Sequence, residues 1–155
     1  MQQRVSLLPA LATALCLLCG GCGGVSDRPV TAPVEGTVTL DGKPLSGAIV
    51  TFWDTAGKNN PTAGNTDASG KYKLAGSNEG AQPGSYKVTV QHFTALDGGP
   101  LKTSEGLDRE QLVQQGQAIQ SLPETYSDYV NSQLSAKVEV GKTNTVDFAL
   151  KSDGS

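Results

Sequence analysis

The chain has 155 residues, a formal net charge of −3, 19 glycines, three cysteines and one histidine. The mild negative charge argues against a nucleic-acid partner, which would call for a basic surface. A single histidine excludes a zinc site with two histidine ligands from one chain, and abundant glycine with few charges favours an all-β domain with many turns.

The first 22 residues have the pattern of a secretory signal that ends at a cysteine. Arg4 precedes an apolar run over residues 5–18, which is shorter than the ~20 residues that span a bilayer. Two small residues, Gly20 and Gly21, stand directly before Cys22, as at a cleavage site. This arrangement resembles the bacterial lipoprotein signal.

The lipoprotein resemblance implies that residues 1–21 are removed as a signal peptide and that Cys22 is lipidated. Several acyl chains at one terminus make a stable anchor, so the protein would sit on a membrane in the cell envelope, outside the cytoplasm. The alternative is an ordinary cleaved signal peptide whose cysteines are incidental. Residues 22–32 are polar, contain Gly and Pro and lack periodicity, which predicts a tether.

All the cysteines, Cys16, Cys19 and Cys22, lie within or at the end of the signal. The remaining chain therefore has no disulfide, no thiol nucleophile and no thiolate metal ligand. Nothing around His92 resembles a nucleophile elbow, and no carboxylate pair stands out. We therefore expect no enzymatic activity, no cofactor and no metal site.

Short segments with one apolar face follow the tether in quick succession. Tight turns separate several of them, notably at Asp41-Gly42 and from Asp67 to Gly70. The predicted strands cover residues 34–40, 48–53, 62–66, 71–74, 85–93, 132–140 and 145–150. Seven such strands must bury their apolar faces against each other, which predicts a seven-stranded antiparallel β-sandwich over residues 33–150.

Residues 94–128 break the strand pattern and are predicted to form one long, partly helical insertion. Asp108 and Gln111 have the spacing of a helix cap. Leu112, Gly116 and Ile119 would form only a narrow apolar stripe, so we expect a short helix. Residues 151–155 are predicted to be a frayed tail.

Four segments, at residues 38–45, 47–52, 66–74 and 83–90, resemble the carboxypeptidase regulatory-like (transthyretin-like) β-sandwich domain. The third contains the Asp-x-x-Gly turn from Asp67, followed by a basic residue and Tyr72. The fourth reads Pro-Gly-x-Tyr-x-Val-x-Val from Pro83. The resemblance covers residues 34–150 and implies one of the small bacterial lipoproteins that consist of this domain alone, with an accessory, adhesive or folding-support role.

Trp53, the only tryptophan, is predicted on the strand face opposite Val50 and Phe52. An exposed indole there could stack on a sugar ring, with hydrogen bonds from nearby polar side chains of Asp54, Asn59 and Asn60. The simpler interpretation is that Trp53 packs under residues 94–121 of the insertion and that these polar residues serve the turn.

Other chemistry-bearing residues have simpler structural interpretations. His92 is expected to cap the rim of the core rather than to bind a ligand or sense pH. Asp67 and Ser69 are expected to form a turn rather than a calcium site, because the EF-hand pattern is absent. The cluster of Tyr126, Asp128 and Tyr129 is expected to pack the insertion against the sandwich.

The residues therefore predict a lipid-anchored, non-enzymatic module of the cell envelope with a structural or protein-interaction role. The alternative is an envelope carbohydrate-binding module that uses Trp53. The expected partners are the membrane, through the N-terminal lipid, and an envelope protein or polysaccharide.

Overall fold

The computed structural model describes residues 30–75, 80–101 and 109–155. The predicted signal peptide, the lipidation site Cys22, most of the tether and the predicted helix cap at Asp108 lie outside the described residues. Within the described ranges, no helix is long and apolar enough to cross a membrane.

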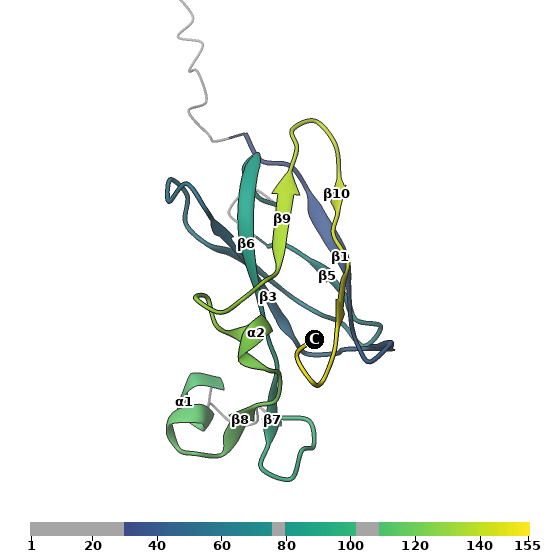
Figure 1. Ribbon diagram of the computed structural model, residues 1–155, viewed down its shortest axis with the longest axis vertical. Coiled ribbons are helices and arrows are strands. Elements are labelled where there is room, and N and C mark those ends of the chain that lie inside the picture. The colour runs from purple at the N-terminus through teal and green to yellow at the C-terminus, as the bar shows by residue number, and fades with distance from the viewer. Residues whose placement is uncertain (1–29, 76–79, 102–108) are drawn as a thin grey trace, which may run out of the picture.

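The described residues form an all-β domain, as the composition predicted, with two short helices among them (Figure 1). The elements in chain order are β1 (Val34–Leu40), β2 (Lys43–Pro44), β3 (Ile49–Asp54), β4 (Thr62–Asn65), β5 (Lys71–Lys73), β6 (Gly84–Gln91), β7 (Phe93–Ala95), α1 (Arg109–Gln114), β8 (Ala118–Gln120), α2 (Glu124–Ser127), β9 (Ser135–Val138), β10 (Asn144–Thr145) and β11 (Phe148–Leu150).

Two larger sheets and one hairpin organise these strands. The first sheet is built around β1, with β5 and β2 antiparallel to it and β10 and β11 parallel to it. Since β5 and β10 both pair with Glu35, they flank β1 on opposite sides. The second sheet has the order β4-β3-β6-β9 and is antiparallel throughout, and β7 pairs with β8 in a separate hairpin.

The apolar faces of the two larger sheets share one core. Phe52 of β3 stands at its centre, and its ring centroid lies 6.5 Å from Tyr72 of β5 and 6.4 Å from Phe148 of β11, both in the opposite sheet. The inward rows are those that alternation predicts: Val34 and Val38, then Val50 and Phe52, then Tyr86, Val88 and Val90, and finally Phe148 and Leu150.

The prediction that all strands run antiparallel is wrong for β1. Its pairs with β10 and β11 are parallel, because the chain reaches β10 from β9, which lies in the other sheet. Alternation reports which face of a strand is buried but not its direction or partner.

Several predicted boundaries also change. The last predicted strand is divided into β10 and β11 by Val146 and Asp147, and Val140, expected inward, is exposed in the turn after β9. The strands β2, β7 and β8 were not predicted. The tail is not frayed, because the Tyr126 hydroxyl donates to the carbonyl oxygen of Ser155 at 2.9 Å.

Gly36 explains the break between β10 and β11. A Cβ atom at residue 36 would collide with the carbonyl oxygen of Val146. That carbonyl turns toward the core and accepts a hydrogen bond from the Tyr72 hydroxyl at 2.7 Å. In a regular ladder a backbone carbonyl would accept the N–H of Thr37. Here the side chain of Asp147 takes its place, since its Oδ1 atom accepts that N–H at 2.7 Å.

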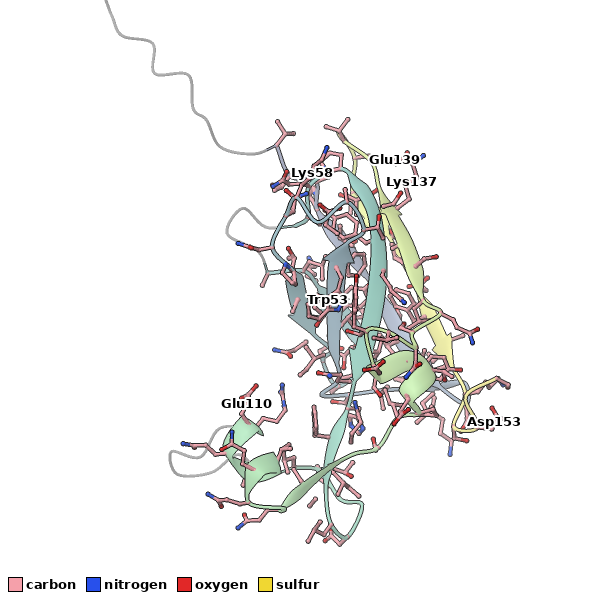
Figure 2. The ribbon with its side chains drawn as sticks, turned by 60° about the vertical axis from the view of Figure 1, so that its left-hand side comes forward. Trp53, Lys58, Glu110, Lys137, Glu139 and Asp153 are labelled. Carbon is pink, nitrogen blue, oxygen red and sulfur yellow. The ribbon has the colours of Figure 1, made fainter. Side chains whose placement is uncertain are left out.

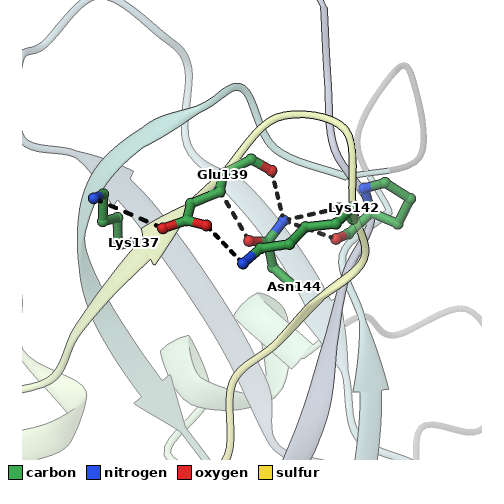
Figure 3. A network of polar contacts seen from close by, with 5 residues as sticks. Lys137, Glu139, Lys142 and Asn144 are labelled. Atoms are coloured by element: carbon green, nitrogen blue, oxygen red, sulfur yellow. Dashed lines mark hydrogen bonds and ion pairs between the residues drawn. The ribbon is translucent and has the colours of Figure 1, made fainter.

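The buried side-chain amide of Asn144 attaches the first residues of the folded domain to the turn after β9 (Figure 3). Asn144 donates its Nδ2 to the carbonyls of Glu139, Lys142 and Pro33 at 3.0, 3.2 and 3.4 Å, and its Oδ1 accepts the Glu139 N–H at 2.9 Å. Just before Pro33, Ala32 is buried and forms a two-bond bridge with Ala81. Ala32 was assigned to the tether but belongs to the folded domain.

The part of the insertion with β7, α1 and β8 forms a small unit at one end of the molecule, whereas α2 lies against β6 of the sandwich (Figure 1). Helix α1 is short, as predicted, and ends where Gly116, at φ +67°, donates to the Val113 carbonyl and Gln117 donates to the Leu112 carbonyl. This pair of bonds is a Schellman cap. Leu112 is buried, but Ile119, expected on the same apolar stripe, lies on β8 and is exposed.

Candidate functional site

Trp53 lies on the outward face of β3, as alternation predicted, and is half-buried there. Its indole N–H donates to the hydroxyl of Thr89 on the neighbouring strand β6 at 3.0 Å. The ring of Tyr129, which follows α2, packs against the indole with a centroid distance of 5.3 Å and an interplanar angle of 60°. Trp53 is therefore covered from one side by the segment after α2 (Figure 2).

Lys87 of β6 extends this aromatic pair. Its ammonium nitrogen lies 5.3 Å from the centroid of the Tyr129 ring and donates to the Val130 carbonyl at 2.9 Å. A cation over an exposed aromatic ring contributes about 0.5–1 kcal/mol. Lys87 thus holds the segment after α2 on the sheet and occupies part of the space beside Tyr129.

Asp54 and Asn59 organise their own loop. The Asp54 carboxylate accepts the backbone N–H groups of Ala56, Lys58 and Asn59, each at 3.0 Å, and the Asn59 side-chain Nδ2 at 2.9 Å. These bonds, led by that of Ala56, lower the pKa of Asp54 despite an opposing effect of desolvation. Asn60 is exposed on the same loop.

The predicted carbohydrate-binding residues thus lie close together in the chain, but most of their polar atoms are already bonded within the protein. The indole N–H of Trp53, both oxygens of Asp54 and the amide nitrogen of Asn59 have partners. Sugar binding at these residues stays a prediction.

The other residues noted in the sequence have structural surroundings. Asp67 accepts the N–H and hydroxyl of Ser69 and the N–H of Lys71, which forms the predicted turn, and the Ser69 side chain is the main cause of its lowered pKa. Tyr126 is buried in the core, whereas Asp128 caps a turn by accepting the N–H groups of Val130 and Asn131. Among the described residues, no group of three His, Cys, Asp or Glu could hold a metal ion.

His92 marks the point where the chain leaves the four-stranded sheet. It separates β6 from β7, and its Nδ1 lies 2.6 Å from the hydroxyl of Ser121, the residue directly after β8. Its backbone N–H donates to the Gln120 side chain at 2.9 Å. Burial lowers the pKa of His92, and a backbone hydrogen bond with Ser46 opposes that shift.

An exposed apolar surface on the insertion escaped the sequence analysis. Seven large apolar side chains among the described residues are exposed; three of them lie on the insertion and two lie directly after it. These five are 40–76% exposed: Leu96, Val113, Ile119, Tyr129 and Val130. Periodicity could not find them, because each lies in a turn or on a short element with no clear repeat.

One depression lies beside β3, β7 and α1, and another lies over β1. The smaller, of about 230 Å³, lies between Ile49 of β3, Phe93 of β7 and Val113 of α1, where the guanidinium of Arg109 stands 5.8 Å from the Phe93 centroid. The larger, of about 550 Å³, is an open polar groove over β1 and β5. Its exposed pair of Lys73 and Glu35, at 3.5 Å, contributes little to stability.

No family model and no curated protein matches the chain. Similar solved structures include a DUF3823 family protein from Parabacteroides merdae (15% identity, 79% of this chain and 46% of that chain, TM-score 0.40) and BcpA, the major pilin subunit of Bacillus cereus (18%, 79% and 30%, TM-score 0.39). A dioxygenase domain from Streptomyces sp. SirexAA-E is 21% identical over 82% of this chain and 83% of that chain, with a TM-score of 0.36. The chain spans less than half of the first two proteins. Likenesses this distant carry no argument about family or function.

Proposed function

We propose that this protein is a lipid-anchored, non-enzymatic module of the bacterial cell envelope that binds a partner protein through its insertion. In this proposal Cys22 carries the lipid, and the folded domain is a β-sandwich of the carboxypeptidase regulatory-like type.

The architecture supports the proposed domain type. Six of the seven predicted strands have a counterpart, and the seventh has two. The residues quoted for the resemblance have structural roles: Asp67 and Gly70 shape a turn, while Tyr72 and Tyr86 point into the core. These roles favour an architectural interpretation of the shared motifs.

The observation that carries the binding role is the exposed apolar surface of the insertion. Scattered apolar residues on a surface are ordinary, but three of these, Leu96, Val113 and Ile119, lie on the insertion, and such a concentration is typical of an interaction site. Val113 and Ile119 lie on neighbouring elements, since α1 contacts β8. A protein partner fits such a surface, because it can bury apolar side chains around a polar rim.

The carbohydrate-binding alternative has less support. A sugar site needs an accessible aromatic face and free polar groups beside it. Tyr129 packs on Trp53, and the Asp54 carboxylate is fully used by its own loop. Asn60 remains accessible, but one exposed amide is a weak basis for sugar recognition.

The first test concerns the anchor. The full chain is expressed in a bacterial host, the membrane fraction is extracted with detergent, and the mass of the protein is measured. We expect an N-terminus at residue 22 with the mass of a diacylglyceryl group and a further acyl chain. Cys22→Ala should abolish the modification and release the protein from membranes; an unmodified wild-type chain would refute the anchor.

The second test concerns the partner. A photo-crosslinking amino acid replaces Ile119 or Val113 in cells, and matched controls carry it at the exposed positions Lys58 and Lys137. Irradiation should yield a discrete protein adduct at the two insertion positions only. Absence of adducts there, or equal adducts at all four positions, would contradict the proposed interface.

A further inference from the structure

The two proposed points of attachment lie at opposite ends of the molecule. The described chain begins at Val30, at one end of the long axis, and the insertion with β7, β8 and α1 lies at the other end (Figure 1). A pull between the membrane anchor and a partner on the insertion would therefore act along the long axis, which is also the direction of β1 and β6.

At the anchor end, the force would enter β1, a central strand. From Val34 to Thr37 it lies between β5 and β10, and from Val38 to Leu40 between β2 and β11. Hydrogen bonds attach β1 to the neighbouring chain on each side. Val146 donates to the Glu35 carbonyl at 2.8 Å on one side, and Leu74 donates to the Val34 carbonyl at 3.0 Å on the other.

The chain ahead of β1 is also attached on two sides. Ala32 exchanges hydrogen bonds of 2.8 and 3.1 Å with Ala81, and the Pro33 carbonyl accepts the backbone N–H of Asn144 at 2.8 Å. A pulled N-terminus would have to break these bonds before β1 itself moved.

At the insertion end, the force would enter β6, the strand that continues through His92 into β7. In the four-stranded sheet it pairs with β9 over residues 84–87 and with β3 over residues 86–91. The chain that returns from the insertion is hydrogen-bonded at the same point, because the Ser121 N–H donates to the His92 carbonyl at 2.8 Å. Both strands that would receive the load are therefore central, one in each sheet.

We propose that this domain acts as a force-resisting link between the membrane anchor and whatever the insertion binds. Ladder hydrogen bonds run perpendicular to antiparallel strands and at a slant between parallel ones, so in both cases they run across the strands. A pull along β1 and β6 therefore loads many of them together instead of one after another. Neither β1 nor β6 is an edge strand of its sheet, so neither can be peeled away by itself. The physiological role rests on the proposed anchor and partner. The dependence of the unfolding force on the direction of pulling does not rest on them.

Single-molecule force spectroscopy tests this inference on the unlipidated chain from Cys22 to Ser155, in which Cys22 is the only thiol. One handle is attached at Cys22. The other is attached at a cysteine introduced as Leu96→Cys, in the exposed turn after β7. The matched control uses Lys137→Cys on β9, an exposed position on an edge strand at the same end as the N-terminal attachment (Figure 2).

At equal pulling speed, we expect the unfolding force between residues 22 and 96 to exceed that between residues 22 and 137 roughly two-fold or more, because many bonds must break together in the first geometry. Circular dichroism checks that both variants are folded. If the Lys137→Cys variant is not folded, Ser135→Cys replaces it. Equal or lower force in the first geometry would overturn the inference. An unlipidated protein in the host would instead refute the anchor and leave this mechanical result unchanged.

Discussion

The indole N–H of Trp53 and the hydroxyl of Thr89 form a 3.0 Å hydrogen bond between two neighbouring strands, on the outer face of the four-stranded sheet. Thr89 is almost fully buried although it points away from the core, because Trp53 and the segment after α2 cover it. The bond satisfies the only polar atom of the indole, so Trp53 serves here to attach one part of the chain to another.

Tyr129→Ala should expose Trp53 with little loss of stability. Removing the ring that packs on the indole is expected to shift the tryptophan emission to longer wavelength and to increase its quenching by iodide. The free energy of unfolding should fall by about 0.5–1.5 kcal/mol, the usual size of an aromatic pair. Asn60→Ala, on the neighbouring loop, is the control and should leave both emission and stability unchanged. Unchanged emission in Tyr129→Ala would contradict the contact.

Phe52→Ala should be among the most destabilising substitutions. Phe52 is fully buried and contacts aromatic rings from both sheets, so its removal leaves a cavity that neither layer can fill. The expected loss is about 3–5 kcal/mol, measured by urea denaturation. Thr51→Ala, at the adjacent position on the outer face, should cost far less. Similar losses for the two variants would place the core elsewhere.

Asn144→Ala should destabilise the start of the fold. The substitution leaves the N–H of Glu139 and three carbonyls without their amide partner, for an expected loss of about 1–3 kcal/mol. Lys142→Ala is the control: it removes an exposed ion pair with Glu139 at 2.6 Å and should change stability by less than about 1 kcal/mol. If Lys142→Ala proved the more damaging variant, the role assigned to Asn144 would be wrong.

Gly36→Ala should unfold or strongly destabilise the domain, whereas Gly84→Ala should be tolerated. Both glycines lie in β-strands. A Cβ at residue 36 collides with the Val146 carbonyl, which receives the Tyr72 hydroxyl, but a Cβ at residue 84 meets only the Tyr86 ring at an ordinary 3.8 Å. Thermal unfolding of the two variants measures the difference. A folded Gly36→Ala with wild-type stability would contradict the close approach of the two chains.

His92 should make stability depend on pH near neutrality. Burial lowers its folded-state pKa below the ordinary value of 6.5, so the unfolded chain binds more protons between the two values. The stability that His92 contributes is therefore present above pH 6.5 and is lost as the pH falls through the folded pKa. Urea denaturation at about pH 7.5 and about pH 5.5 should show lower stability at the acidic value. His92→Gln should reduce this difference; an unchanged pH dependence would assign it to other groups.

Much of the core could be predicted because alternation is a local property. Val50 and Phe52 point inward because successive side chains on a strand point to opposite faces, and the same rule put Trp53 outward. The turn at Asp67 was equally predictable, because its side chain bonds to backbone groups only two and four residues away. The candidate site was less predictable: the sequence pointed to Trp53 and, separately, to packing by Tyr129, but not to the contact between the two residues, which lie 76 positions apart.

The amino-acid sequence by itself determined the all-β class, the inward rows of side chains, the turns and the short helix ended by Gly116. These features depend on backbone preferences and on neighbours within a few residues. Only the tertiary structure decided that β1 runs parallel to β10 and β11, that Asn144 holds Pro33, and that the insertion presents Val113 and Ile119 to solvent. Each of these depends on which distant segments meet. The free-energy difference between alternative pairings of segments comes from packing over the whole core and not from any local pattern.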